Sequence, residues 1–203
     1  MARGGVIIVS QSASSQDLLP STVAPPDWSR FYVKPQNFNR NRAYNLTQSW
    51  LSQDYSQMWD EWCYQGIPPR LMIEELLRGD TGVIPNDYKF FMFDGKCEVI
   101  QVDSDRFGIH TRDLFDARWV GLDISFGSYA KSAVIIPKPE DLSEMILIAE
   151  KLSQDLDFVR VDLYRTDSGI KFGELTNYPE AGKVDFVTES DDNAIGSRWN
   201  PKY

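Results

Sequence analysis

Histidine and cysteine are nearly absent from this chain. Its 203 residues include a single histidine, His110, and two cysteines, Cys63 and Cys97. One histidine excludes a histidine-rich metal centre. Two cysteines far apart in the sequence indicate neither a disulfide framework nor a cysteine-type zinc site. Such sparse cysteine is typical of a reducing compartment, and we expect the protein to be cytoplasmic.

Long apolar runs and an excess of positive charge are also lacking. No stretch approaches the roughly 20 apolar residues of a membrane span, and residues 6–9 (VIIV) are too short for the core of a signal peptide. The formal net charge of −9 argues against the basic face of a nucleic-acid binder. The apolar share of 42% and the charged share of 25% are ordinary for a globular protein. We therefore expect a globular chain without a membrane span or a nucleic-acid partner.

The first part of the chain predicts one strand, a long loop and one helix. Residues 4–9 (GGVIIV) predict a glycine turn leading into a buried strand, and residues 11–37, rich in Ser, Pro and Gln, predict a loop or insertion. Residues 38–63 predict a helix with a broad apolar stripe that includes Tyr44 and Trp50. An aromatic core face explains that stripe better than a binding site.

The middle and end of the chain predict further strands and one helix. Asp94-Gly95 between apolar runs is a strong hairpin signal. The elements expected here are a short strand at 71–73, hairpin strands at 88–93 and 96–102, an irregular polar segment at 103–131, a helix at 140–153, and an irregular tail at 178–203.

A second hairpin brings two acids together. Residues 158–164 (FVRVDLY) and 170–177 (IKFGELTN) alternate in polarity, as half-buried strands do. A type I turn at residues 167–169, closed by a glycine at positive φ, would place Thr166 opposite Ile170. Asp162 would then lie opposite Glu174. Opposed carboxylates repel each other, and Mg2+ binds such acids together with substrate phosphates. A solvated face on which two acids happen to meet is the alternative.

Other residues offer weaker signals for a phosphate site. Lys89 shares a strand face with Phe91 and Phe93, either as an edge-strand lysine with a buried stem or as a cation in a cleft. Arg106, His110 and Arg112 either extend a cationic wall or are solvated loop charges. Gly4 and Gly5 provide backbone N–H donors for a phosphate or form a plain turn. Glu74 and Glu75 suit a ribose, or are exposed acids at a strand end.

The order of these segments is more specific than any one of them. It closely resembles the TupA-like branch of the ATP-grasp superfamily, a branch named for teichuronopeptide biosynthesis. The resemblance covers nearly the whole chain, and DYKFF and FGELT are its most diagnostic blocks. The segments that carry it are 4–9 (GGVIIV), 68–77 (PPRLMIEELL), 85–95 (PNDYKFFMFDG), 105–106 (DR), 114–119 (LFDARW), 158–164 (FVRVDLY) and 172–176 (FGELT).

The resemblance implies an α+β ATP-grasp fold that holds ATP between two subdomains. Such proteins usually activate a carboxylate as an acyl phosphate, which an amine attacks to give an amide. ATP and Mg2+ are the implied cofactors, and a precursor of a cell-surface polysaccharide or peptide polymer is the implied substrate. The implied site comprises Gly4 and Gly5 at the phosphates, Ile73, Glu74, Glu75 and Leu76 at adenine and ribose, Lys89 and Arg106 as catalytic cations, and Asp162, Glu174 and Asn177 (or Thr176) as metal ligands.

The chain departs from the superfamily at its start. Members normally carry a preceding lobe and a strand that ends in a phosphate-binding lysine, whereas this sequence begins at the glycine loop. We therefore expect an incomplete amino-terminal lobe, with residues 1–77 as a remnant of the small subdomain and residues 78–203 as the carboxy-terminal subdomain with the metal site. The alternatives are an inactive or fragmentary module that binds nucleotide weakly or only a protein partner, and a phosphotransferase on the same fold.

Overall fold

The computed structural model divides the chain into two compact units, Met1–Leu77 and Arg78–Tyr203. The division falls at Leu77, where the sequence placed a boundary. The assignment of the two units as ATP-grasp subdomains stays a prediction. The residues that the structure describes are 6–9, 29–32, 40–52, 67–75, 77–79, 84–105, 109–125, 127–183 and 186–201.

Unit 1 contains a three-stranded parallel sheet in the order β2-β1-β3. Its strands are β1 (Val6–Val9), β2 (Ser29–Tyr32) and β3 (Met72–Glu75). The expected strand at residues 6–9 is confirmed, but a strand within residues 11–37 was not expected. β3 begins one residue later than predicted and includes both glutamates, which were expected to follow it.

Among the described residues of unit 1, α1 (Arg40–Leu51) is helical. It confirms the first half of the predicted helix, and residues 53–63 lie outside the described residues. Ala43, Thr47 and Trp50 form its buried face, whereas Tyr44 is 63% exposed. Tyr44 therefore does not belong to the buried stripe on which it was predicted.

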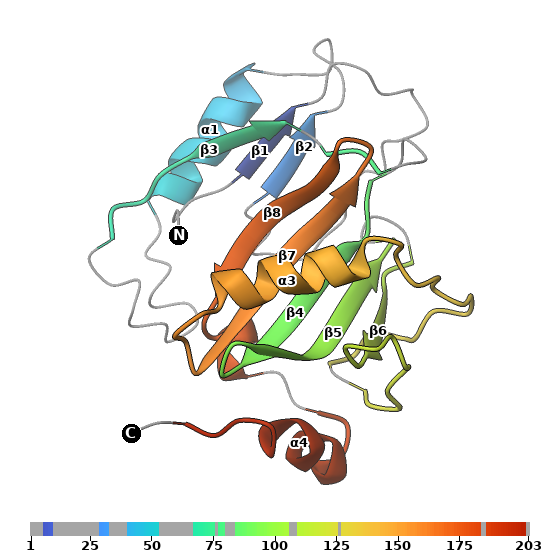
Figure 1. Cartoon of the computed structure of the whole chain (residues 1–203). Coiled ribbons are helices and arrows are strands. Elements are labelled where there is room, and N and C mark those ends of the chain that lie inside the picture. Colours follow the sequence, from blue (N-terminus) through green and yellow to red (C-terminus); the bar gives the residue numbers. More distant parts are fainter. Residues whose placement is uncertain are drawn as a thin grey trace. The chain divides into compact units, whose positions relative to one another are not determined.

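Unit 2 is built on a five-stranded antiparallel sheet in the order β6-β5-β4-β7-β8 (Figure 1). Asp94 (φ 49°) and Gly95 (φ 74°) make the sharp turn between the first two strands, as the Asp-Gly signal predicts. The helix α3 (Leu142–Leu152) confirms the predicted helix at 140–153. The strands are β4 (Asp87–Phe93), β5 (Lys96–Ser104), β6 (Thr111–Phe115), β7 (Phe158–Thr166) and β8 (Gly169–Thr176).

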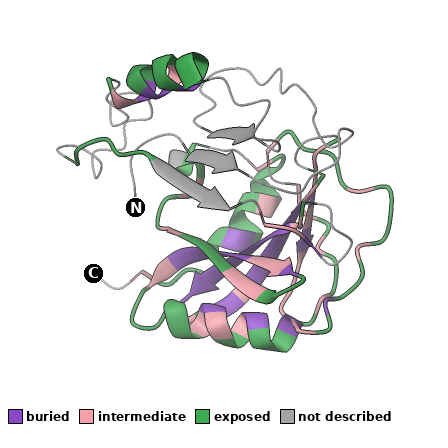
Figure 2. Ribbon diagram, turned by 90° about the horizontal axis from the view of Figure 1, so that it is seen from above, coloured by how far each residue is buried: buried purple, intermediate pink, exposed green. Residues whose placement is uncertain are grey.

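The main hydrophobic core lies between this sheet and α3, which crosses one face of it (Figure 1). Side chains alternate between the faces of a strand, so every second residue of β4 points to α3. Tyr88, Phe90 and Met92 do so, and they pack with Val161 of β7 and Met145 of α3. Burial is concentrated in the inner strands and on the inner side of α3 (Figure 2).

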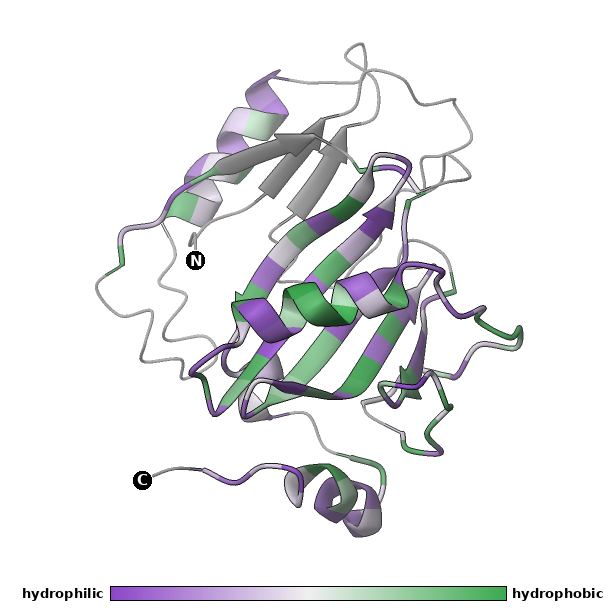
Figure 3. Ribbon diagram, in the orientation of Figure 1, coloured by the Kyte–Doolittle hydropathy of each residue, from purple (hydrophilic) through white to green (hydrophobic). Residues whose placement is uncertain are grey.

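The opposite face of the sheet is apolar at one end and polar at the other. Phe91, Phe93, Val99 and Leu114 form the apolar end, together with Ile195 of the helix α4 (Glu189–Gly196). Thr188 caps α4, because its hydroxyl accepts a hydrogen bond from the Asp191 N–H at 3.1 Å. The ribbon coloured by hydropathy shows apolar and polar residues alternating along the strands (Figure 3).

Two predictions of irregular structure were wrong. The segment 103–131 contains β6, and the tail contains α4 as well as the short 3-10 helix Pro179–Gly182. β6 has few apolar residues, and its burial alternates, with Arg112 and Leu114 inside. A buried arginine hides the pattern by which a half-buried strand is recognised.

Candidate functional site

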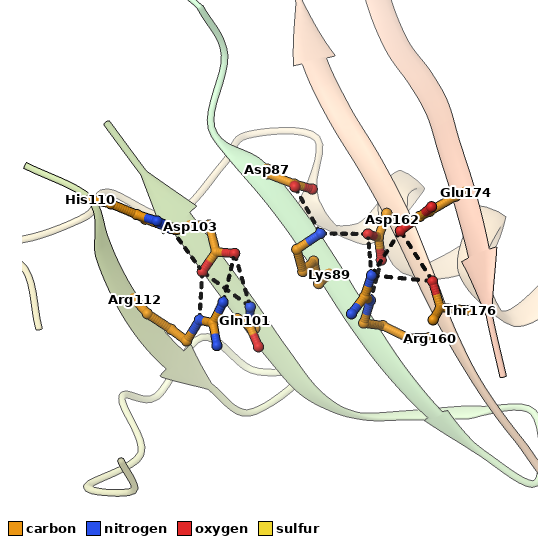
Figure 4. A network of polar contacts seen from close by, with 10 residues as sticks. All are labelled: Asp87, Lys89, Gln101, Asp103, His110, Arg112, Arg160, Asp162, Glu174 and Thr176. Carbon is orange, nitrogen blue, oxygen red and sulfur yellow. Dashed lines mark hydrogen bonds and ion pairs between the residues drawn. The ribbon is translucent and has the colours of Figure 1, made fainter. Parts of the chain in front are cut away.

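The polar end of the face opposite α3 carries a row of side chains across neighbouring strands (Figure 4). In strand register, Glu174 lies opposite Asp162, Asp162 opposite Lys89, and Lys89 opposite Gln101. The expected facing of Asp162 and Glu174 is therefore confirmed. β4 is the central strand of the sheet, so the reading of Lys89 as an edge-strand lysine is wrong.

The pair arises by a route that the sequence did not predict. The structure pairs Thr166 with Gly169 and Arg165 with Ile170, not Thr166 with Ile170. A register shift after Asp162 adds one residue on β8 and restores the Asp162–Glu174 pairing.

Gly173 is the residue that this shift leaves over, because Leu163 pairs with Phe172 and Asp162 with Glu174. A Cβ on Gly173 would come within 2.9 Å of the Tyr164 ring and 3.1 Å of the Asp162 carbonyl oxygen. The bulge therefore needs a glycine at this position.

The first of two polar groups spans β4, β7 and β8. Lys89 Nζ donates to Asp162 Oδ2 at 2.5 Å and lies 2.7 Å from Asp87 Oδ2. Lys89 is 8% exposed and Asp162 is 2% exposed. Charges so deep inside a protein are stable only when they are paired and hydrogen-bonded. We call this group the β4–β7–β8 network; its members are Asp87, Lys89, Arg160, Asp162, Glu174 and Thr176.

Arg160 lies between the two facing acids. Its Nε donates to Asp162 Oδ1 at 2.7 Å. Its Nη2 donates to Asp162 Oδ2 at 2.8 Å and to Glu174 Oε1 at 2.9 Å. The same nitrogen reaches the Thr176 hydroxyl at 3.1 Å, and that hydroxyl donates to Glu174 Oε1 at 3.2 Å. Burial alone would lower the pKa of Arg160, but the charges of Asp162, Glu174 and Asp87 raise it, so the guanidinium stays charged.

The second group, the β5–β6 network, surrounds Asp103 and consists of Gln101, Asp103, His110 and Arg112. Arg112 donates to both Asp103 oxygens, at 2.8 and 3.2 Å, and Gln101 Nε2 lies 3.0 Å from each. His110 Nε2 is 3.6 Å from Asp103 Oδ1. Burial would raise the pKa of Asp103, but the hydrogen bond and charge of Arg112, with Lys89 and His110, lower it. Because the charge of Arg112 is paired with that of Asp103, Arg112 contributes little to the row of cations that was predicted to attract phosphate.

The facing acids have the chemistry that Mg2+ requires. A single nitrogen of Arg160 contacts an oxygen of each acid, so Asp162 and Glu174 are close enough to share one cation. Mg2+ is commonly held by one or two carboxylates together with substrate phosphates. No group of three or more His, Cys, Asp or Glu side chains in the described part of the chain is arranged to hold a metal. The two facing carboxylates fit a cation that takes its other oxygen ligands from phosphate.

The other predicted residues are distributed differently. Asn177 is exposed and takes no part in the hydrogen bonds of this network within the described residues, whereas Thr176 does. Ile73, Glu74 and Glu75 lie in β3 of unit 1. Gly4, Gly5, Leu76 and Arg106 lie outside the described residues.

The sequence places Arg160 on the same strand face as Asp162 and Glu174 but predicts no role for it in the site, and it predicts none for Asp87 or Asp103. A simple signal was present for two of them. Arg160 and Asp87 each stand two residues before a predicted site residue on the same strand, so they share its face. Asp103 fell in a segment predicted to be irregular, which concealed its register.

The model of one family matches this chain: TupA-like ATPgrasp, over residues 31–200. The chain belongs to the TupA-like ATP-grasp family, and the expected α+β class is confirmed. The fold is of the ATP-dependent ligase type, and proteins of this family generally use ATP and Mg2+. Comparison with curated proteins and with solved structures gave no match. None of the described helices is long and apolar enough to cross a membrane.

Proposed function

We propose that the chain is an ATP- and Mg2+-dependent ligase that joins a carboxylate to an amine through an acyl phosphate. The observation that carries the proposal is the row Lys89–Asp162–Glu174 on adjacent strands of a TupA-like ATP-grasp chain. The branch is named for teichuronopeptide biosynthesis, which supports a precursor of a cell-surface polysaccharide or peptide polymer as the substrate. The sparse cysteines support the cytoplasm as the location.

The roles of the site residues follow from their chemistry and from the resemblance to the family. Asp162 and Glu174 hold the cation, with Thr176 or Asn177 as a further oxygen donor. A Mg2+ ion held by these residues would neutralise charge on the transferred phosphoryl group. Lys89 places its ammonium beside Asp162, where it attracts the β- and γ-phosphates. Arg106 assists Lys89, Gly4 and Gly5 donate N–H groups to phosphate, and Ile73, Glu74, Glu75 and Leu76 take adenine and ribose.

Catalysis by these groups is mainly electrostatic. Fixed charges aimed at a transferred phosphoryl group lower its barrier without reorganising during the reaction. Asp162 is 2% exposed and Lys89 8%, and charges act more strongly where water is excluded. The acceptor amine needs no general base if it arrives deprotonated.

Thermal unfolding with and without ATP tests this proposal. A ligand at 100 times its dissociation constant stabilises by about 2.7 kcal/mol, which raises Tm by about 5–10 °C for a chain of this size. We expect ATP with Mg2+ to raise Tm in this range and Glu174→Gln to abolish the rise. Glu98→Gln is the matched control, because Glu98 pairs with Arg198 outside the site.

An unmoved melting curve at millimolar ATP with Mg2+ would favour the alternative, an inactive or fragmentary module that binds only a protein partner. If ATP binds, the products decide between the two reactions. A ligase releases ADP and phosphate when both acceptor and donor are present. A phosphotransferase leaves the phosphate on the acceptor.

A further inference from the structure

Arg160 contacts the same oxygens that the proposed cation needs. Asp162 accepts three hydrogen bonds from the two cations: one from Lys89 and two from Arg160. A carboxylate offers about four lone-pair sites, so Asp162 has little capacity left. Glu174 Oε1 receives both Arg160 and Thr176.

These contacts explain how two facing acids coexist. Carboxylates directly opposite each other on neighbouring strands destabilise a sheet. Here the Arg160 guanidinium, whose side chain is 8% exposed, bridges them, while the side chain of Glu174 is 53% exposed. The bridge is open to solvent on the Glu174 side and buried on the Asp162 side.

We propose that Arg160 is an internal counter-ion that holds the Asp162–Glu174 pair closed and competes with a divalent cation for it. This inference rests on the proposed function and concerns the regulation of the same site. A cation that arrives alone must displace the guanidinium from the carboxylates of both Asp162 and Glu174. A cation that arrives with a polyphosphate brings a replacement partner for Arg160.

Two consequences follow for binding. The bare cation binds weakly, and ATP raises its affinity. By linkage, the cation raises the affinity for ATP by the same factor. The site thereby takes up the complex of metal and nucleotide in preference to the free metal.

The test is the affinity of the full chain for Mn2+ without nucleotide, measured by electron paramagnetic resonance of the free ion. Hydrogen bonds to charged groups contribute about 1.5–3 kcal/mol, and 1.4 kcal/mol is a factor of ten in affinity. We therefore expect Arg160→Gln to bind Mn2+ at least about tenfold more tightly than the wild type. Arg160→Lys keeps the charge but cannot bridge both acids bidentately, and we expect it to gain several-fold.

Controls separate the bridge from general electrostatics. Lys171→Gln removes a positive charge from β8, the strand of Glu174, at a position paired with Tyr164, and it should leave Mn2+ affinity nearly unchanged. If Arg160→Lys equals the wild type, charge alone acts, and the proposal that the guanidinium holds the pair closed by bridging both acids is overturned. Unchanged or weaker binding by both variants, or no Mn2+ binding by any protein, also overturns it. If Arg160→Gln fails to fold by circular dichroism, Arg160→Lys decides.

The same series distinguishes the two proposals. If ATP with Mg2+ stabilises the wild type but the Arg160 variants do not bind Mn2+ more tightly, the proposed ligase function is supported and the proposed counter-ion role of Arg160 is contradicted. If those variants bind Mn2+ more tightly but ATP does not stabilise the wild type, the counter-ion role is supported and the proposed nucleotide-dependent function is contradicted.

Discussion

The β5–β6 and β4–β7–β8 networks lie on one face of one sheet but differ in how their charges are matched. Asp103 is 2% exposed and is bonded by Arg112 and Gln101, so its charge is already satisfied. Glu174 has a side chain that is 53% exposed and shares one arginine with a second acid. A satisfied pair stabilises the fold, whereas an acid in excess at an open edge is suited to bind a cation. The contrast favours a structural role for the first network, and our proposed function uses the second for ligand binding.

Among the changes that test this contrast, Asp103→Asn should have the largest effect, a loss of folding stability. It removes the carboxylate charge to which the buried Arg112 guanidinium donates two hydrogen bonds. Removing one partner of a buried pair costs about 3–5 kcal/mol. Urea denaturation at neutral pH measures the loss. Asp123→Asn is the matched control, because Asp123 pairs with Lys131 at the surface and its loss should leave the midpoint unmoved. A small effect at Asp103 would contradict a structural role for its network.

Gly173→Ala should act on the second network at a smaller cost to the fold. The added Cβ meets the Tyr164 ring at 2.9 Å and the Asp162 carbonyl oxygen at 3.1 Å. Overpacking of this kind costs about 1–3 kcal/mol, and the displaced bulge should also weaken Mn2+ binding. Gly169→Ala tests the same hairpin through its φ of +98°, where space is open. It should lower stability without changing Mn2+ affinity; equal losses of Mn2+ affinity in both variants would contradict the role of the bulge.

Lowering the pH should gradually reduce the contribution of Asp103 to the free energy of unfolding. The pKa of Asp103 is lower in the folded state than its ordinary value of about 4. Its pairing therefore stabilises the fold above the ordinary pKa and is lost as the pH falls through the lowered value. The groups that face it are Arg112, His110, Lys89 and Asp87.

The difference in stability between the wild type and Asp103→Asn should thus narrow as the pH falls below about 4. Urea denaturation from pH 7 to pH 3 measures this difference. A difference that stays constant over this range would show that Asp103 is not charged in the folded protein.

Glu174→Gln should have the smallest effect on the unliganded fold. Its carboxylate is half exposed, and ion pairs near the surface contribute about 0–1 kcal/mol. Arg160 keeps its two bonds to Asp162. We expect a change within about 1 kcal/mol in urea denaturation without nucleotide. A loss as large as that of Asp103→Asn would mean that both networks are structural.

Regular alternation and turn chemistry made most of unit 2 predictable from the sequence. β4 and β7 have apolar residues at every second position, and in β5 and β8 the alternation is interrupted by one register shift each. Asp94-Gly95 supplies a turn that few other dipeptides make so well. β2 and β6 were not predicted, because neither carries enough apolar residues to show a period. The position of Glu174 was predicted from a wrong register that the bulge at Gly173 corrected.

The site was only partly predictable for a related physical reason. Lys89, Asp162 and Glu174 came from a resemblance and from strand pairing. The bridge by Arg160 depends on the direction of a long side chain, which sequence spacing does not determine. Asp103 and Arg112 meet across β5 and β6, and their pairing required knowledge of a strand that the sequence conceals.

β4 has no residue that is free to vary. All seven of its positions are buried. Every second residue packs against α3, and the residues between them, which include Asp87 and Lys89, lie on the opposite face with the polar networks. Sequence drift in this strand must therefore satisfy two independent requirements at once. In a saturation mutagenesis screen β4 should stand out as an unbroken block of intolerance, while in the outer strand β8 tolerant and intolerant positions should be interspersed.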